Sequence, residues 1–192
     1  MKSNHTPWNP KHLDVAAFAQ TAEIMSGAAA LEDFHRLQSS CVPNQNAGVQ
    51  NHQHEGALIR WELVGECKAV MGGQPQVWLH LKAQAQVQLE CQRCLENVVY
   101  ALNIARRFLF AKDEATAQEW DETVEEDILV LTSRLDVHEL VEDELLLALP
   151  LIPRHEKCPS HAPALAVLKA QSDEDELDHP FAVLAQLKKG GS

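Results

Sequence analysis

The stretch Val77-Trp-Leu-His-Leu-Lys-Ala-Gln-Ala-Gln-Val-Gln-Leu-Glu-Cys-Gln-Arg-Cys94 alternates between two kinds of residue along most of its length. The odd-numbered positions from Val77 to Cys91 are apolar, and the even-numbered positions from Gln76 to Glu90 are mostly polar. Successive side chains of a strand point to opposite faces, so this pattern predicts a long strand that buries one face and not a helix. A slip of one residue would turn the whole apolar set toward water, so the pattern also specifies the register.

Neighbouring segments extend this prediction to a sheet. Residues 57–67 and 98–110 alternate in the same way, residues 128–131 form a short apolar run, and two glycines and a proline within 71–75 predict a turn. Short helices are expected over 11–20 and 28–37, with a strand over 21–27, and the acidic residues 113–127 are expected to form a solvated loop. The predicted fold class is α+β: an antiparallel sheet or small partly closed barrel of about four to five strands packed against one long helix, with short terminal helices.

The long helix is predicted to begin after Asp136 and to end at Pro150. Asp136 is followed three residues later by Glu139, which is the pattern of an N-cap and its returning acid. At 100° per residue, Glu139, Glu142 and Asp143 lie opposite an apolar face that consists of Val137, Leu140, Val141, Leu145, Leu147 and Ala148. Glu144 falls near the middle of the apolar face, where a carboxylate is unfavourable unless it is paired. We therefore expect a buried ion pair of Glu144 with Arg93 or Arg106.

Length and composition predict one main domain in a cytoplasmic protein. The 192 residues are long enough for a single core over residues 1–170, followed at 171–192 by an acidic linker and a short amphipathic C-terminal helix that starts at Pro180. No apolar run reaches the length of a membrane span, and residues 1–10 lack the apolar core of a signal peptide. We expect no membrane partner.

The net charge of −12 argues against broad binding to nucleic acid, and no DNA partner is expected. Residues 58–112 are the exception, with seven basic and four acidic side chains. Arg93, Arg106 and Arg107 in this range are candidates for a local contact with RNA or with a protein partner. The simpler interpretation is that they are ordinary outward-facing side chains.

Two pairs of residues form the one candidate site in the sequence. Cys91-x-x-Cys94 lies at the end of the long strand, and His155-x-x-Cys158 follows the long helix. Three thiolates and one imidazole form a tetrahedral zinc site in many proteins, although the separation of the two pairs exceeds the usual zinc-finger spacing. Packed free thiols and a dithiol redox pair are alternative interpretations. The redox pair is disfavoured because no helix begins at Cys91 to lower its pKa.

Two sequence blocks resemble the bacterial YceD family. They are Cys91-Gln-Arg-Cys-Leu-Glu96 and Val141-Glu-Asp-Glu-Leu-Leu-Leu-Ala-Leu-Pro150, the latter followed by Pro153-Arg-His155 and Cys158, and the segment Pro180-Phe-Ala-Val-Leu184 is also similar. The resemblance implies a role in the synthesis, processing or stability of large-subunit (23S) ribosomal RNA, and hence in ribosome biogenesis. It supplies no catalytic residues.

We therefore expect a non-enzymatic factor for accumulation of large-subunit ribosomal RNA. Its expected partner is that RNA or the pre-50S particle, reached directly or through a protein. The alternative hypothesis is a zinc- or thiol-dependent enzyme that acts on RNA or on a ribosomal protein.

Overall fold

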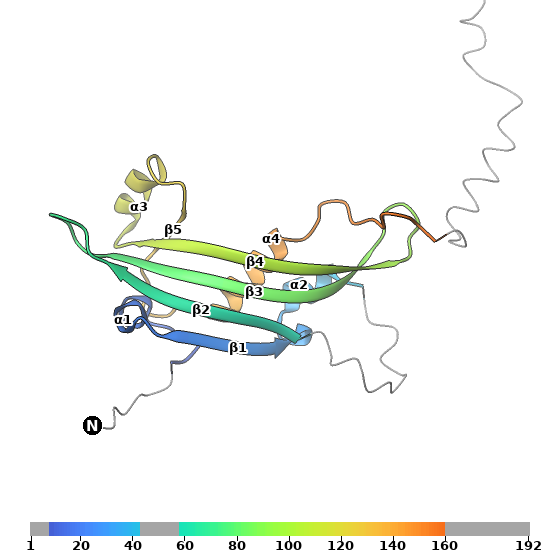
Figure 1. The fold of residues 1–192 in the computed structure, drawn as a ribbon, viewed down its shortest axis with the longest axis horizontal. Helices are drawn as coiled ribbons and strands as arrows, with labels where there is room; N and C mark the ends of the chain where they lie inside the picture. Colours follow the sequence, from blue (N-terminus) through green and yellow to red (C-terminus); the bar gives the residue numbers. More distant parts are fainter. Residues whose placement is uncertain (1–7, 43–57, 160–192) are drawn as a thin grey trace, which may run out of the picture. The chain divides into compact units, whose positions relative to one another are not determined.

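The computed structural model describes residues 8–42 and 58–159 (Figure 1). These residues form a sheet with helices packed on it, so the predicted α+β class is confirmed. The strands are β1 (Ile24–Ala30), β2 (Leu58–Lys68), β3 (Gln76–Glu90), β4 (Asn97–Ala111) and β5 (Asp127–Val130). The helices are α1 (Val15–Thr21), α2 (His35–Ser40), α3 (Glu114–Asp121) and α4 (Val137–Leu147), with a short 3-10 helix η1 (Leu31–Asp33).

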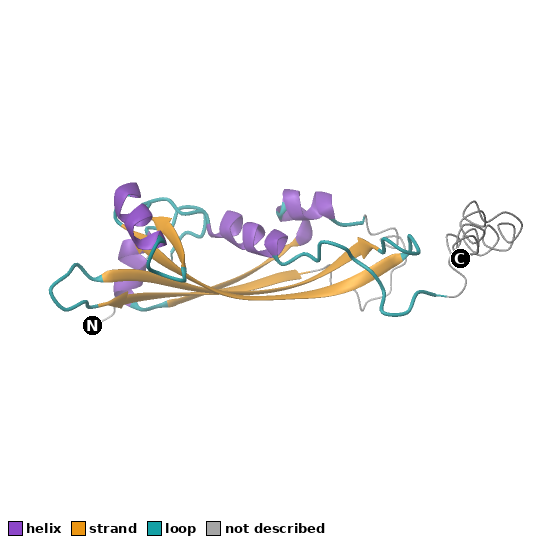
Figure 2. Cartoon of the chain, turned by 90° about the horizontal axis from the view of Figure 1, so that it is seen from above, coloured by secondary structure: helices purple, strands orange, loops and turns teal. Residues whose placement is uncertain are grey.

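The sheet is open and has the order β1-β2-β3-β4-β5. β1 and β3 both pair antiparallel with β2, whereas β5 pairs parallel with the end of β4. The parallel strand differs from the predicted antiparallel sheet, and it is possible because α3 lies in the crossover from β4. The helices lie on one face of the sheet, as Figure 2 shows.

The alternation of β3 is confirmed. Every odd-numbered residue from Val77 to Leu89 is buried, and most of the even-numbered residues are partly or fully exposed. Trp78 is an exception on the second face, where it is 7% exposed and lies under the ammonium group of Lys68. The core between sheet and helices is completed by Phe18 of α1 and by residues of α4, of which Val141 is fully buried.

The predicted N-terminus of the long helix is also confirmed. The side chain of Asp136 accepts hydrogen bonds from the backbone N–H groups of His138 (2.8 Å) and Glu139 (3.2 Å). The helix is shorter than predicted and ends at Leu147. The side chain of Leu147 is 72% exposed, so this residue is not part of the buried apolar face.

Two predicted segments were wrong in part, since helical structure in the first occurs only at 31–33 and 35–40, and irregular structure in the second mainly at 122–126. Residues 28–37 were expected to form a helix, but Ala28, Ala29 and Ala30 pair with β2, so backbone bonding to the sheet overrides the helix propensity of alanine. Residues 113–127 were expected to form a loop. They contain α3, which begins where the Asp113 carboxylate accepts a hydrogen bond from the backbone N–H of Thr116 at 2.8 Å.

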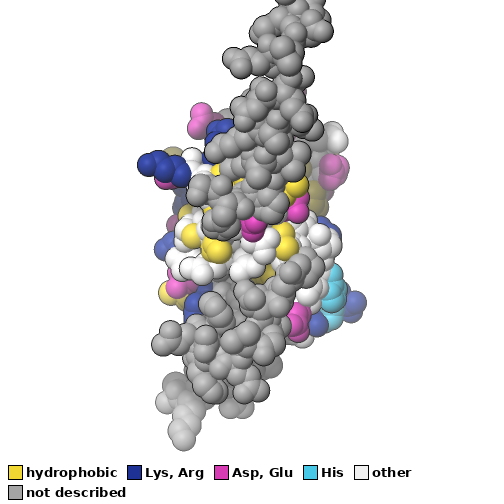
Figure 3. Space-filling view, turned by 90° about the vertical axis from the view of Figure 1, so that its right-hand side faces the viewer, with side chains coloured by type: hydrophobic (Ala, Val, Ile, Leu, Met, Phe, Trp, Pro, Cys, Tyr) yellow, Lys and Arg dark blue, Asp and Glu magenta, His cyan; other side chains and the backbone are white. Residues whose placement is uncertain are grey.

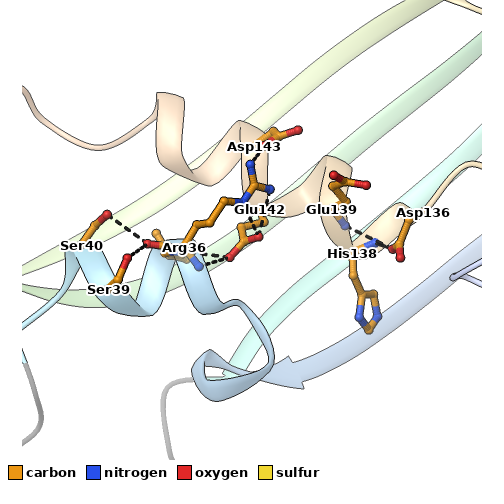
Figure 4. A network of polar contacts seen from close by, with 9 residues as sticks. Arg36, Ser39, Ser40, Asp136, His138, Glu139, Glu142 and Asp143 are labelled. Atoms are coloured by element: carbon orange, nitrogen blue, oxygen red, sulfur yellow. Dashed lines mark hydrogen bonds and ion pairs between the residues drawn. The ribbon is translucent and has the colours of Figure 1, made fainter.

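The prediction that Glu142 lies on the solvent-facing side of the helix was also wrong, because Glu142 is buried. Its carboxylate accepts hydrogen bonds from the backbone N–H groups of Arg36 (2.8 Å) and Leu37 (3.1 Å), and from the Arg36 guanidinium (2.9 Å). Arg36 reaches Asp143 as well, so that one arginine of α2 bridges two acids of α4 (Figure 4). Helical periodicity predicts which residues share a face, but it does not reveal that α2 covers Glu142.

The chain divides into two compact units. Unit 1 comprises Met1–Leu89 and Val99–Pro150, and unit 2 comprises Glu90–Val98 and Leu151–Ser192. The predicted boundary at residue 171 and the predicted C-terminal helix lie outside the described residues. Among the described helices, none is long and apolar enough to cross a membrane.

Candidate metal centre

The two pairs of predicted metal ligands lie together in unit 2. The ligand atoms of Cys91, Cys94, His155 and Cys158 are all within 4.8 Å of one another. Cys91 and Cys94 are 0% and 1% exposed, and they form a small core with Val98 and Cys158 packed against it. Residues separated by more than 60 positions in the sequence therefore meet at one point.

Local backbone structure positions the first pair. The chain turns after Cys91, so that the N–H of Leu95 donates to the carbonyl of Cys91 (2.8 Å) and the N–H of Cys91 donates to the carbonyl of Glu96 (3.0 Å). Leu95 adopts a positive φ of 61°, which is uncommon for leucine and tightens this turn. The second pair is held against the first because the N–H of Gln92 donates to the carbonyl of Pro153 at 2.9 Å.

Two distances between ligand atoms of the cluster are close to those of tetrahedral coordination. Bond lengths of about 2.3 Å for Zn–S and about 2.0–2.1 Å for Zn–N place two sulfurs about 3.8 Å apart, and a sulfur and a nitrogen about 3.6 Å apart. The Cys91 and Cys158 sulfurs are 3.8 Å apart, and the Cys94 sulfur is 3.4 Å from Nδ1 of His155. A disulfide requires sulfurs about 2.05 Å apart, and all five cysteines are free.

The outer contacts also suit a metal site. Nε2 of His155 lies 3.1 Å from the carbonyl oxygen of Asn97, so this nitrogen carries the proton and leaves Nδ1 facing the sulfurs. A metal-bound histidine typically donates its other ring N–H in this way. Arg93 Nε donates to the Cys158 sulfur at 2.9 Å, and the backbone N–H of His155 donates to the Cys91 sulfur at 3.4 Å.

The electrostatics of the two buried thiols differ. Burial alone would raise the pKa of Cys91, but the backbone N–H groups of Arg93, His155 and Cys94 donate to its sulfur and lower the pKa to about 5. Burial, together with the neighbouring thiols of Cys158 and Cys91, raises the pKa of Cys94 to about 11 against the opposing effect of the Glu96 backbone N–H. A dication would favour the thiolate form of each ligand.

These features favour metal binding over the two alternative interpretations. One expectation used against a redox pair was wrong, because backbone N–H groups lower the pKa of Cys91 although no helix begins there. A redox-active dithiol also needs access to its substrate, however, and Cys91 and Cys94 are buried. Simple packing of free thiols does not account for the orientation of the imidazole or for the N–H groups directed at all three sulfurs. The cluster can therefore bind a metal ion such as zinc.

The candidate ion pair of Glu144 lies in unit 1. Arg106, and not Arg93, contacts it: Arg106 Nε donates to Glu144 Oε2 at 3.0 Å. Glu144 is 7% exposed, and its burial raises its pKa although the Arg106 guanidinium opposes this effect.

The three arginines offered as an RNA or partner contact all bind groups of their own chain. Arg93 contacts Cys158 and the carbonyl of His155, Arg106 contacts Glu144, and Arg107 contacts Glu126 at 2.7 Å. In Figure 3, basic and acidic side chains are interspersed over the described surface that faces the viewer. An RNA contact through these arginines stays a prediction.

The groups that surround the ligands, Arg93 and the carbonyl of Asn97, were not predicted in this role. The position of Arg93 between two cysteines was a usable signal, because an N–H donor in a Cys-x-x-Cys turn lies close to sulfur. The carbonyl of Asn97 carries no such signal, since any residue supplies a backbone acceptor.

Comparisons with known proteins agree with the two sequence blocks. A family model described as "Large ribosomal RNA subunit accumulation protein YceD" matches residues 79–188, a range that includes all four candidate ligands. A protein of Haemophilus influenzae with the same description is 34% identical over 110 residues, which cover 56% of this chain and 63% of that protein. The matched part thus spans less than two thirds of the relative's length. No solved structure matches.

Proposed function

Because the chain belongs to the YceD family, we propose that it supports the accumulation of large-subunit (23S) ribosomal RNA as a non-enzymatic assembly factor. We further propose that Cys91, Cys94, His155 and Cys158 hold a structural zinc ion in the cytoplasmic protein. The observation that carries the second proposal is the set of four converging ligand atoms with an oriented imidazole.

The composition of the cluster supports a structural role. Catalytic zinc sites usually have three protein ligands and an open position for water or substrate, whereas structural sites are closed by four protein ligands. Three sulfurs and one imidazole nitrogen supply all four positions here. In addition, two of the sulfurs belong to buried residues, which does not favour a thiol-dependent enzyme.

The charge of the zinc site supports the role of Arg93 as a structural group. Zinc bound by three thiolates and a neutral imidazole carries one net negative charge, and Arg93 places a guanidinium nitrogen 2.9 Å from the Cys158 sulfur. This contact neutralises the site locally, and loss of such an outer contact typically lowers metal affinity by about 10–100-fold.

Zinc content tests the site. Protein purified without chelator is expected to contain one zinc ion per chain by elemental mass spectrometry, and Cys91→Ser and Cys158→Ser are expected to lose it. Cys67→Ser is the matched control because Cys67 is exposed and outside the cluster. Zinc-free wild-type protein, or equal zinc in all three variants, would contradict the proposal.

Association with ribosomal particles tests the biological role. The tagged full chain is expected to co-sediment with precursors of the large subunit, and its depletion should lower the ratio of 23S to 16S ribosomal RNA. The role is wrong if the wild-type chain sediments free of these particles and depletion leaves the ratio unchanged. Loss of the association at high salt would indicate an electrostatic contact.

A further inference from the structure

Unit 1 contains a groove that the metal centre does not involve. Its volume is about 480 Å³, and it is lined by residues of β4, β5 and α4, by the last residue of α3 and by the turn that follows α3. The accessible apolar surface of its lining comes mainly from Leu147, which is 72% exposed, and half-buried Ile128, whereas Phe108 and Leu140 form its buried floor. A polypeptide segment can bury apolar side chains against such a surface.

The lining of the groove is strongly acidic. One guanidinium, that of Arg106, faces six carboxylates. Glu144 is engaged by Arg106, Glu126 by Arg107, and Asp143 by Arg36. The carboxylates are those of Asp121, Glu125, Glu126, Asp127, Asp143 and Glu144.

Three of these carboxylates have no basic partner within the part of the chain that the structure describes. They are Asp121, Glu125 and Asp127, and each of the three residues is exposed. Their charge accumulates near buried Glu144, whose pKa is raised first by burial and further by Asp127 and Asp143. A cationic ligand would relieve this repulsion.

The edge of the sheet beside the groove is a second, independent feature. β5 pairs only with Phe108–Ala111 of β4, and it is the only described strand on that side of β4. The preceding residues Ala105, Arg106 and Arg107 are exposed. A strand edge of this kind offers backbone N–H and C=O groups to an added strand, which a polyamine or a metal ion cannot use.

We propose that this groove binds a basic, extended segment of a protein partner. The backbone of this segment adds to the edge of β4 next to β5. The Lys and Arg side chains of the segment reach Asp121, Glu125 and Asp127, and its apolar side chains contact Leu147. The inference rests on the proposed function. It names the class of protein partner through which this acidic chain would contact a ribosomal precursor particle that is rich in RNA. The net charge of −12 disfavours both RNA and a second copy of this chain as occupants.

Binding of a synthetic peptide to the full chain tests the proposal. The probe is a short labelled peptide in which lysine and valine alternate, and fluorescence anisotropy reports its affinity at low ionic strength. The groove variant Asp121→Asn/Glu125→Gln is expected to bind about tenfold more weakly than wild type. The matched control Glu119→Gln/Glu122→Gln removes the same charge from exposed positions outside the groove and should bind like wild type.

A second probe isolates the contribution of the strand edge. The same peptide with alternate backbone nitrogens methylated keeps its charge but cannot donate to β4, so it should bind at least about tenfold more weakly. Equal affinity for both peptides, or equal competition by spermine at matched charge, would overturn the proposal in favour of non-specific attraction. Equal weakening in the groove and control variants would overturn it as well.

The remaining outcomes separate this inference from the proposed function. If sedimentation shows a dimer that the groove variant dissociates, the occupant is a second copy and the proposal is overturned. If wild type co-sediments with large-subunit precursors but does not bind the peptide, the groove inference fails and the proposed function stands. If wild type binds the peptide selectively but does not co-sediment, the groove inference stands and the proposed function fails.

Discussion

Glu142 and Glu144, two acids of the same helix, illustrate how residue environment decides the effect of a buried charge. Burial would raise the pKa of Glu142, but the backbone N–H of Leu37 and both donors of Arg36 outweigh it, so the pKa is lowered. Burial of Glu144 is opposed by Arg106 alone and reinforced by neighbouring acids, so its pKa is raised. The two residues therefore make opposite contributions to the pH dependence of stability.

The direction in which stability changes with pH follows from how tightly the folded chain binds the proton of each glutamate. Glu142 binds its proton more weakly in the folded than in the unfolded chain. It therefore stabilises the fold above pH 4.5, the ordinary pKa of glutamate, and this stabilisation is lost as the pH falls through the lower pKa of the folded chain. Glu144 binds its proton more tightly in the folded chain. Its contribution is greatest below 4.5 and declines as pH rises through its folded pKa.

Urea unfolding of Glu142→Gln and Glu144→Gln at a series of pH values from about 3.5 to about 7 tests this difference. This range includes 4.5, the ordinary pKa of a glutamate side chain. Glu142→Gln is expected to lower the free energy of unfolding at neutral pH by about 1–3 kcal/mol, and the loss should shrink below pH 4.5. Glu144→Gln should change it by about 1 kcal/mol or less and become relatively more favourable as pH rises. The same pH profile in both variants would contradict the assignment.

At the scale of elements, strands with sustained alternation were predictable, and segments decided by their neighbours were not. β3 was predicted because fifteen residues repeat one pattern, and the Asp136 cap because its side chain acts within its own helix. The end of β1 at Ala30 depends on pairing with β2, and the parallel direction of β5 depends on the crossover. These outcomes arise from tertiary contacts that override local propensity.

The candidate ligands were predictable for a similar reason. Each pair, Cys91 with Cys94 and His155 with Cys158, is local in sequence and consists of residue types that bind metals. The two pairs were also predicted to form one candidate site, and the structure brings their ligand atoms together. The acceptor at Asn97 could not be predicted, because it is a backbone carbonyl that is positioned by a contact between distant segments.

The packing of α1 on β2 gives a prediction for one glycine. A Cβ atom at Gly65 would lie 2.7 Å from the Cα of Ala19 and 2.9 Å from a ring carbon of Phe18. Gly65→Ala is therefore expected to lower the free energy of unfolding by about 1–3 kcal/mol, because the helix must shift away from the strand.

The matched control for that variant is Gly73→Ala. A Cβ at Gly73 meets only Val70, at 3.5 Å or more, which is ordinary contact. Its stability should stay within about 0.5 kcal/mol of wild type in the same urea titration. If Gly65→Ala is as stable as this control, the close approach of α1 to β2 does not hold.

At the scale of the whole molecule, the two units depend on different forces. Unit 1 has an extensive apolar core between its sheet and its helices. The apolar core of unit 2 in its described part consists of Cys91 and Cys94, with Val98 and Cys158 packed against them. So few apolar residues do not stabilise a fold without a further link, and the proposed zinc ion would supply one.

Hydrogen exchange with and without a strong chelator tests this division. Removal of zinc is expected to abolish amide protection in residues 90–98 and 151–158, whereas the central residues of β2 and β3 should keep theirs. Cooperative loss of protection throughout the chain would contradict the independence of the core of unit 1. Unchanged protection in unit 2 would contradict a stabilising metal.

The separation of the four ligands along the chain has a consequence during synthesis. Cys91 precedes His155 by 64 residues, so the first two ligands leave the ribosome well before the other two exist. In that interval the growing chain carries half of the proposed metal site. If the cluster binds zinc as proposed, capture of the ion requires translation past Cys158, and a product that stops at α4 would carry the thiols of Cys91 and Cys94 without their two partner ligands.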